Sequence, residues 1–222
     1  MTTVAGGFGP AALHFFDALE EDNSREFWLA HVDEFEREVK APMTALLESL
    51  PAEYQSFRMF RMNRDLRFSK DKSPYKLQHS GVLSAGGIDH YVHLDAGGLL
   101  AACGIYWMQR DQLERYRAAV DDGRRGKALM RILADLGPAD PGSTMGVDAL
   151  KTAPRGYPRD HPRIDLLRQK GVVAHRTLSG PELADGVRVR QFVLEVFESA
   201  KPLNAWLKRH VGPTSESNEP GS

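Results

Sequence analysis

The chain has 222 residues, of which 41% are hydrophobic, 27% charged and 9% aromatic, and its formal net charge is −1. This apolar content supports a buried core and excludes disorder over most of the chain. No run approaches the roughly 20 apolar residues that a membrane-spanning helix needs, and no secretory signal is visible at the beginning. The single cysteine, Cys103, excludes an internal disulfide. We therefore expect a cytoplasmic protein without a membrane partner.

Positive charge is concentrated in two short segments, although the total charge is close to zero. Residues 61–76 and residues 155–176 each contain six basic and two acidic side chains, whereas residues 1–60 contain four basic and eleven acidic ones. A nonspecific DNA-binding protein neutralises many phosphates and is usually basic as a whole. The distribution therefore disfavours nucleic acid as the partner, without excluding it, and favours a small anionic ligand.

Two helices are predicted within the first 60 residues. Residues 1–7 are expected to form a flexible N-terminus, and Pro10 suits the first turn of a helix that reaches about Glu20. Asn23, with Glu26 three residues later, resembles a capping box and predicts the start of a second helix. Apolar side chains recur on one face of both segments, so we expect both helices to pack on the core.

From residue 60 onward the pattern indicates strands. Between Phe60 and Phe68 the apolar period approaches two, but Arg64 falls on the apolar side, so either it is paired there or the strand bends. Further strands are expected at Gly81–Ala85, Tyr91–Asp95 and Leu99–Met108, with turns at Ala85-Gly86-Gly87 and Ala96-Gly97-Gly98. Short turns between successive strands predict an antiparallel meander.

Helices are expected again in the second half of the chain. They are placed at Asp111–Val120, at Arg125–Leu136, from near Pro162, and in two apolar segments that end near His210. The predicted fold is a single α+β domain over residues 8–210, in which an antiparallel sheet of four or more strands is covered by N- and C-terminal helices. Residues 211–222 are expected to be a disordered tail.

The segment 61–76, with the sequence RMNRDLRFSKDKSPYK, carries the residues best suited to chemistry. Arginine offers a planar fork for carboxylate or phosphate, and lysine offers a mobile charge. A strand that ends in a turn rich in donors can surround an anion, although a salt-bridged surface hairpin has the same composition. Asp65 is a candidate catalytic residue that would also orient a neighbouring cation. The candidate anion-binding residues here are Arg64, Arg67, Lys70, Lys72 and Lys76.

RDLRFSKDKSPYK also resembles the signature of an uncharacterised, mainly bacterial family, domain of unknown function 2461. The similarity extends to FGPAALHFFDALEEDNSREFWLAHVDEFEREVKAP, to YVHLDAGGLLAACGIYWM with LERYRAAV, and to APRGYPRDHPRIDLLRQK, and it covers about residues 8–210. Ser24 departs from the family pattern, in which a second asparagine is more frequent. The resemblance implies a shared fold and candidate residues, but no reaction.

Both cationic segments fall within blocks that resemble the family. Pro154-Arg155-Gly156 can place an arginine on a tight turn, and His161 follows it. We expect Arg155 to converge with the cations of residues 61–76 on one cleft, with His161 as a further candidate. His161 is also the predicted proton-transfer group, because an imidazole titrates near neutral pH.

The leading prediction is a cytoplasmic enzyme or binding protein, without a cofactor, for a small phosphate- or carboxylate-bearing compound. The alternative is a nucleic-acid or protein interaction module that uses residues 61–76, where Phe68 and Tyr75 could stack on bases. In a third interpretation the segment is architectural, and its aspartates neutralise cations. The sequence indicates neither the reaction nor the oligomeric state.

Other motifs carry less weight. Ser69–Lys72 matches S-x-x-K, but a proline follows too soon for the helix that this chemistry needs. His90, His93 and Asp95 do not form a metal site in an extended strand, because His90 points to the opposite face. Cys103 lies in an apolar stretch and is expected in the core. No phosphate-binding loop or dinucleotide motif occurs, and no metal is predicted.

Overall fold

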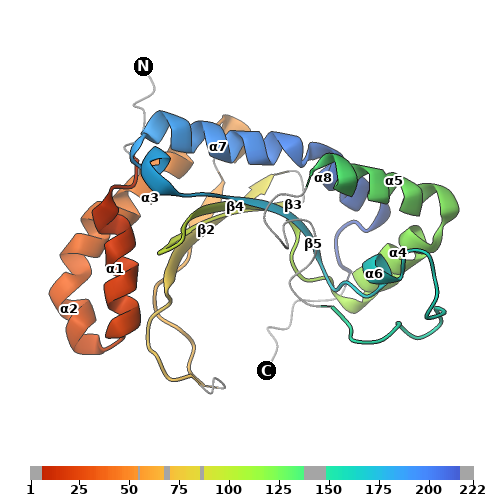
Figure 1. Cartoon of the computed structure of the whole chain (residues 1–222), viewed down its shortest axis with the longest axis horizontal. Coiled ribbons are helices and arrows are strands. Elements are labelled where there is room, and N and C mark those ends of the chain that lie inside the picture. Colours follow the sequence, from red (N-terminus) through yellow and green to blue (C-terminus); the bar gives the residue numbers. More distant parts are fainter. Residues whose placement is uncertain (1–6, 55, 68–70, 86–87, 138–148, 216–222) are drawn as a thin grey trace. The chain divides into compact units, whose positions relative to one another are not determined.

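A computed structural model describes residues 7–54, 56–67, 71–85, 88–137 and 149–215. Contacts between residues divide the chain into two compact units. Unit 1 comprises Met1–Ala85, His90–Ala101 and Thr177–Glu195, and unit 2 comprises Gly86–Asp89, Ala102–Arg176 and Val196–Ser222. The strands form one five-stranded sheet in the order β1-β2-β3-β4-β5 (Figure 1). The α+β prediction is confirmed.

Helices come first and last along the described chain, and the strands β1 to β4 follow one another between them (Figure 1). In chain order they are α1 (Pro10–Glu21), α2 (Arg25–Glu34), a π-helix (Phe35–Lys40), α3 (Ala41–Glu48), a 3₁₀ turn (Ala52–Tyr54), β1 (Phe57–Met59), β2 (Gln78–Ala85), β3 (Ile88–Asp95), β4 (Gly98–Ile105), α4 (Arg110–Asp121), α5 (Gly123–Asp135), α6 (Ile164–Leu167), β5 (Val172–Leu178), a 3₁₀ turn (Gly180–Ala184), α7 (Gly186–Ser199) and α8 (Lys201–His210).

Two sequence predictions about strands need correction. The extended segment expected from Phe60 to Phe68 is not a continuous strand, because β1 ends at Met59 and a single bridge, Asn63 to Tyr75, follows it among the described residues. Phe68 itself lies outside them. The strand β5 was not predicted, because its run of apolar residues is too short to distinguish a strand from a helix.

The start of α2 also differs from the prediction. Ser24, and not Asn23, is the N-cap: its hydroxyl accepts a hydrogen bond from the backbone N–H of Phe27 at 3.1 Å. This satisfies one of the four backbone donors that a helix leaves unpaired at its beginning. Asn23 is thereby available for a contact far along the chain.

In unit 1 the π-helix and α3 pack on one face of β2. Phe35 meets the imidazole of His79 edge-on, with ring centroids 5.0 Å apart. A Cβ on Gly81 would lie 2.8 Å from the Leu47 side chain, so the glycine lets α3 approach the strand closely. Odd-numbered residues of β2 therefore face the helices, and even-numbered residues face the other side of the sheet.

Unit 2 has its own core. Trp206 on α8 is buried and donates from its indole nitrogen to the Arg125 carbonyl at 3.1 Å. Tyr116 on α4 is fully buried, and its hydroxyl donates to the Leu166 carbonyl at 3.0 Å. Gly104 on β4 has a φ of 138°, and a Cβ there would lie 2.3 Å from the Val172 carbonyl oxygen, so only glycine fits beside β5.

The beginning of the expected C-terminal tail is held against α4. The Asp111 carboxylate accepts hydrogen bonds from the Thr214 hydroxyl at 2.8 Å and from the backbone N–H of Ser215 at 2.9 Å. Arg115, one turn further along α4, donates to the carbonyls of Val211 and Pro213. Residues 216–222 of the expected tail lie outside the described residues. No helix in the described part of the chain is long and apolar enough to cross a membrane.

His79 is a buried titratable group in the core of unit 1. It is 3% exposed, and neither ring nitrogen has a hydrogen-bond partner among the described residues. Burial, followed by the charge of Lys40, lowers the pKa of His79 from 6.5 to about 4, against the opposing charge of Glu36. The folded state therefore favours the neutral imidazole.

We expect His79 to make the protein less stable as the pH falls from about 6.5 to about 4. The unfolded chain binds the proton first, so the folded state loses up to about 3 kcal/mol over this window. The measurement is urea unfolding of the wild type and of His79→Leu at several pH values. The difference in free energy of unfolding between the wild type and His79→Leu should change by this amount in favour of the variant. A parallel decline in wild type and His79→Leu would contradict the assignment.

Candidate anion-binding site

The cationic segment forms a two-stranded extension of β1 and β2 in unit 1. We call residues 60–67 and 71–77 the ribbon; Figure 1 shows it as a long orange-to-yellow hairpin. Its two arms are joined by backbone hydrogen bonds from Arg64 to the Pro74 carbonyl at 2.9 Å and from Lys76 to the Met62 carbonyl at 2.8 Å. The ribbon therefore has a defined register even where regular strand pairing has ended.

Asn23 attaches the ribbon to the junction between α1 and α2. Its amide donates to the Tyr75 carbonyl at 3.2 Å and accepts from the Tyr75 backbone N–H at 2.9 Å. The Trp28 ring stacks on the Tyr75 ring with centroids 4.6 Å apart and an interplanar angle of 16°. A carboxamide thus satisfies both backbone groups of Tyr75, as a neighbouring strand would.

The two aspartates of the ribbon neutralise two of its arginines. Asp65 receives a forked contact from Arg67, with 2.6 Å between Arg67 Nη2 and Asp65 Oδ2 and 3.0 Å between Nε and Oδ1. This contact lowers the pKa of Asp65 to about 2. Asp71 accepts from the backbone N–H and hydroxyl of Ser73 and pairs with Arg64, and these contacts hold its pKa well below the ordinary value.

The predicted lysines have different environments. Lys72 donates to the Leu66 carbonyl at 3.0 Å, and Lys76 donates to the Arg61 carbonyl at 2.9 Å. Lys70 lies outside the described residues. Arg64, Arg67 and Lys72 thus have contacts within the ribbon, which agrees with the salt-bridged hairpin that the sequence left open.

Three cations at the base of the ribbon form no ion pair among the described residues. We call Arg58, Arg61 and Lys76 the cationic cluster. Arg58 and Lys76 lie near the ring of Phe60, with 4.6 Å from the guanidinium carbon and 5.4 Å from Nζ to the ring centroid. Burial, followed by the charge of Arg61, lowers the pKa of Lys76. Within the described part of the chain none of the three forms an ion pair with a carboxylate, so an anion would relieve their repulsion.

Arg58 of the cluster shares one face of the sheet with a row of polar side chains. Arg58 pairs with Val82 on β2, so both point to the even-numbered side, as does Gln78. Gln78 donates to the Tyr91 hydroxyl at 2.8 Å, which places Tyr91 of β3 on the same side. His93 and Asp95 follow at alternate positions of β3, and we call this side of unit 1 the polar face. His90 points the other way and contacts Tyr54, with ring centroids 5.1 Å apart.

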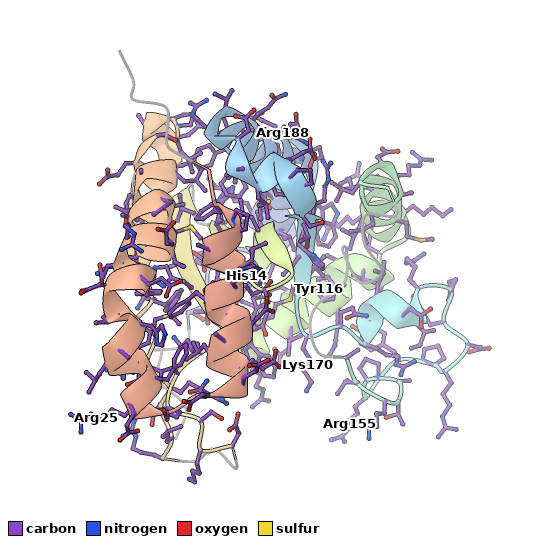
Figure 2. The ribbon with its side chains drawn as sticks, turned by 60° about the vertical axis from the view of Figure 1, so that its left-hand side comes forward. His14, Arg25, Tyr116, Arg155, Lys170 and Arg188 are labelled. Atoms are coloured by element: carbon purple, nitrogen blue, oxygen red, sulfur yellow. The ribbon has the colours of Figure 1, made fainter. Side chains whose placement is uncertain are left out.

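The second cationic segment belongs to unit 2. Arg155 is exposed beside Gly156, whose φ is 91°, and Figure 2 shows Arg155 at the outer edge of its loop. Because Arg155 and His161 are in unit 2 and the ribbon is in unit 1, their convergence on one cleft stays a prediction. Other cations of this segment hold backbone: Arg163 donates to the carbonyls of Val120 and Asp121, and Arg168 to that of Leu150.

His161 lies outside α4 and contacts the last residue of that helix. Its Nδ1 accepts from the backbone N–H of Arg163 at 3.0 Å, and its Nε2 lies 3.1 Å from Asp121 Oδ1. The first contact requires an unprotonated Nδ1, so the proton of the neutral ring is on Nε2, where it can be donated to Asp121. Both nitrogens are therefore engaged, and the proton-transfer roles predicted for His161 and Asp65 remain hypotheses.

Sequence reasoning missed Arg58 and Arg61 as members of the cluster. Arg58 precedes the charged run by three residues, so it was not counted with it. An alternation of Arg58, Phe60 and Met62 was nevertheless present in the sequence, and it could have indicated that Arg58 and Phe60 share a face. Asn23 could not have been found in this way, because its partner is 52 residues further along the chain.

Comparison with known proteins gives one match. A family model described as "Conserved hypothetical protein (DUF2461)" matches residues 11–206. Searches of curated proteins and of solved structures find no match. The matched residues include Asn23, the ribbon and the polar face of β3.

We expect Asn23→Ala to destabilise the protein by about 1–3 kcal/mol, because both backbone groups of the buried Tyr75 lose their partner. Urea unfolding would measure this loss, and hydrogen exchange at the Tyr75 amide should become faster. Asn63→Ala is the matched control, since Asn63 is an exposed asparagine of the same ribbon. Equal stability of the two variants would show that Asn23 does not anchor the ribbon.

Proposed function

Since the chain belongs to the DUF2461 family, whose description assigns no activity, we propose a function from the geometry of unit 1. The protein binds a small compound through a phosphate or carboxylate group, which the cationic cluster of Arg58, Arg61 and Lys76 receives. The observation that carries this proposal is the absence of an ion pair between these three cations and a carboxylate within the described residues, although Arg64 and Arg67 of the same ribbon pair with aspartates.

An incoming anion would interact differently with the paired arginines of the ribbon and with the cationic cluster. Arg64 and Arg67 already have acidic partners, so an incoming anion would compete with Asp71 and Asp65. The charge of Arg61 acts on Lys76, and Arg58 lies over the same Phe60 ring as Lys76, so an anion there would gain about 1.5–3 kcal/mol for each charged hydrogen bond without displacing a carboxylate. The cluster is therefore the stronger binding position, and Arg67 and Lys72 become secondary sources of positive potential.

Both an enzyme and a binding protein are consistent with this site. The proposed location is the cytoplasm, which agrees with the single free cysteine, Cys103. Burial raises the pKa of the Cys103 thiol to about 12, so this thiol is not a reactive group of the site. Arg155 is a further candidate for the same anion, and its contribution depends on the convergence predicted from the sequence.

We expect phosphate to stabilise the wild type and to lose this effect in Arg58→Gln and Lys76→Gln. At ten times its Kd a ligand adds about 1.4 kcal/mol, which raises the Tm of a chain of this size by roughly 3–5 °C. The measurement is thermal unfolding with phosphate, sulfate and citrate at constant ionic strength. Without ligand, the variants should be as stable as the wild type or more so, because a repelling charge has been removed.

Arg25→Gln is the matched control, because it removes an exposed positive charge of unit 1 at the start of α2 (Figure 2). It should keep the full response to phosphate. An equal response in all four proteins would remove the case for the cluster. A single-stranded oligonucleotide that binds more tightly than phosphate, and weakens steeply with salt, would instead favour a nucleic-acid module.

A further inference from the structure

The three strands that carry the polar face place the cationic cluster and a set of hydrogen-bonding groups at the same end of the sheet in unit 1. β1 ends at Met59, opposite Gly81 near the beginning of β2, and the Phe60 N–H continues the pairing to the Ser80 carbonyl at 2.9 Å. β2 begins at Gln78 and its antiparallel neighbour β3 ends at Asp95. The end of β1, the beginning of β2 and the end of β3 are therefore adjacent.

The groups on β2 and β3 are suited to hydroxyls. Asp95 Oδ1 accepts from the backbone N–H groups of Gly97 at 2.8 Å and Gly98 at 3.2 Å, and Asp95 Oδ2 lies 3.3 Å from His93 Nε2. Burial acts to raise the pKa of Asp95, but the contacts with His93 and the backbone outweigh it, so the pKa is below the ordinary value. The side chain of Asp95 is 38% exposed, which leaves a carboxylate edge accessible to a ligand.

Tyr91 and Gln78 provide the remaining part of this surface. The 2.8 Å hydrogen bond between them links β2 to β3, and both side chains are half-buried. The Tyr91 ring meets the His93 ring edge-on, with centroids 5.5 Å apart and an interplanar angle of 75°. A phenol ring beside carboxamide, imidazole and carboxylate groups offers an apolar surface together with donors and acceptors.

The distance between the cationic cluster and the polar side chains of β3 fits a small molecule with two kinds of functional group. β1 and β3 are separated by β2 alone, so the cationic cluster and the β3 row are about 10 Å apart across the sheet. This span is comparable with the length of a hexose phosphate. A ligand whose charge was spread along its whole length would bring negative charge to Asp95, whereas hydroxyl groups can donate to it.

We propose that the ligand class is a phosphorylated polyol or sugar, bound with its phosphate at the cationic cluster and its hydroxyls at Gln78, Tyr91, His93 and Asp95. This inference rests on the proposed function, because it assigns the anionic end of the ligand to Arg58, Arg61 and Lys76. It adds that Gln78 on β2 and the polar side chains of β3 determine the specificity, and that the neutral part of the ligand carries hydroxyl groups.

The test compares ligands that contain one or both parts. Isothermal titration with inorganic phosphate, glycerol 3-phosphate, glucose 6-phosphate and glucose gives four dissociation constants for the wild type. We expect glucose 6-phosphate to bind at least tenfold more tightly than inorganic phosphate, and glucose alone to bind weakly. Gluconate replaces the phosphate arm by a carboxylate, and equally tight binding of gluconate would extend the anionic group to carboxylates.

Variants separate this inference from the proposed function. Asp95→Asn and Gln78→Leu should reduce the preference for glucose 6-phosphate over inorganic phosphate by tenfold or more, with phosphate binding unchanged. Arg58→Gln should weaken both ligands by the same factor. Asp17→Asn, which removes an exposed carboxylate of unit 1 on α1, is the control for a general charge effect.

The binding of phosphate and of glucose 6-phosphate by the wild type separates the two proposals. If wild type binds phosphate and gains nothing from the sugar, the polyol inference is wrong and the anion site stands. If wild type binds neither phosphate nor glucose 6-phosphate, both are wrong. Hydrogen exchange of the variants checks that the sheet is intact, so that a lost preference is not a lost fold.

Discussion

The side-chain amide of Asn23 pairs with both backbone groups of Tyr75, and the position of the ribbon depends on this contact. Beyond Met59 regular strand pairing stops, so backbone hydrogen bonds within the hairpin do not by themselves fix its orientation relative to the helices of unit 1. Asn23 and the stacked ring of Trp28 supply that orientation from the α1–α2 junction. Ser24 caps α2, so the side chain of Asn23 is available to form the hydrogen bonds with Tyr75 that a neighbouring strand would otherwise form.

With the ribbon fixed, its charges fall into two groups of different character. In the outer part of the ribbon Asp65 pairs with Arg67 and Asp71 pairs with Arg64, and solvent screens these exposed ion pairs. At the base, Lys76 and Arg58 lie near the Phe60 ring, and neither cation forms an ion pair with a carboxylate among the described residues. The architectural and the binding interpretations of the segment therefore apply to different residues of the same hairpin.

Much of the fold was predictable because it depends on local periodicity. The helix that begins at Pro10 and the glycine-punctuated strands β2, β3 and β4 follow from residue spacing alone, and the turn at Gly97 and Gly98 is present. β5 was missed because Val172–Leu178 has no alternation, and its assignment depends on pairing with β4. The candidate site was located only in part: Lys76 was predicted, but its partners Arg58 and Phe60 become neighbours through the register of β1 on β2.

The π-helix at Phe35–Lys40 has a consequence for how this region can change in evolution. The hydrogen bonds of a π-helix close one residue later than those of the α-helix that surrounds it, so it behaves as a single-residue insertion between α2 and α3. A turn of this kind takes up the extra residue locally, and the helical segments on either side of it keep their faces. Deleting one residue there would therefore restore an uninterrupted α-helix and leave Met43, Leu46 and Leu47 buried, with the close approach of Leu47 to Gly81 retained. Relatives that share this sheet can thus differ by one residue between Phe35 and Lys40 without losing this packing.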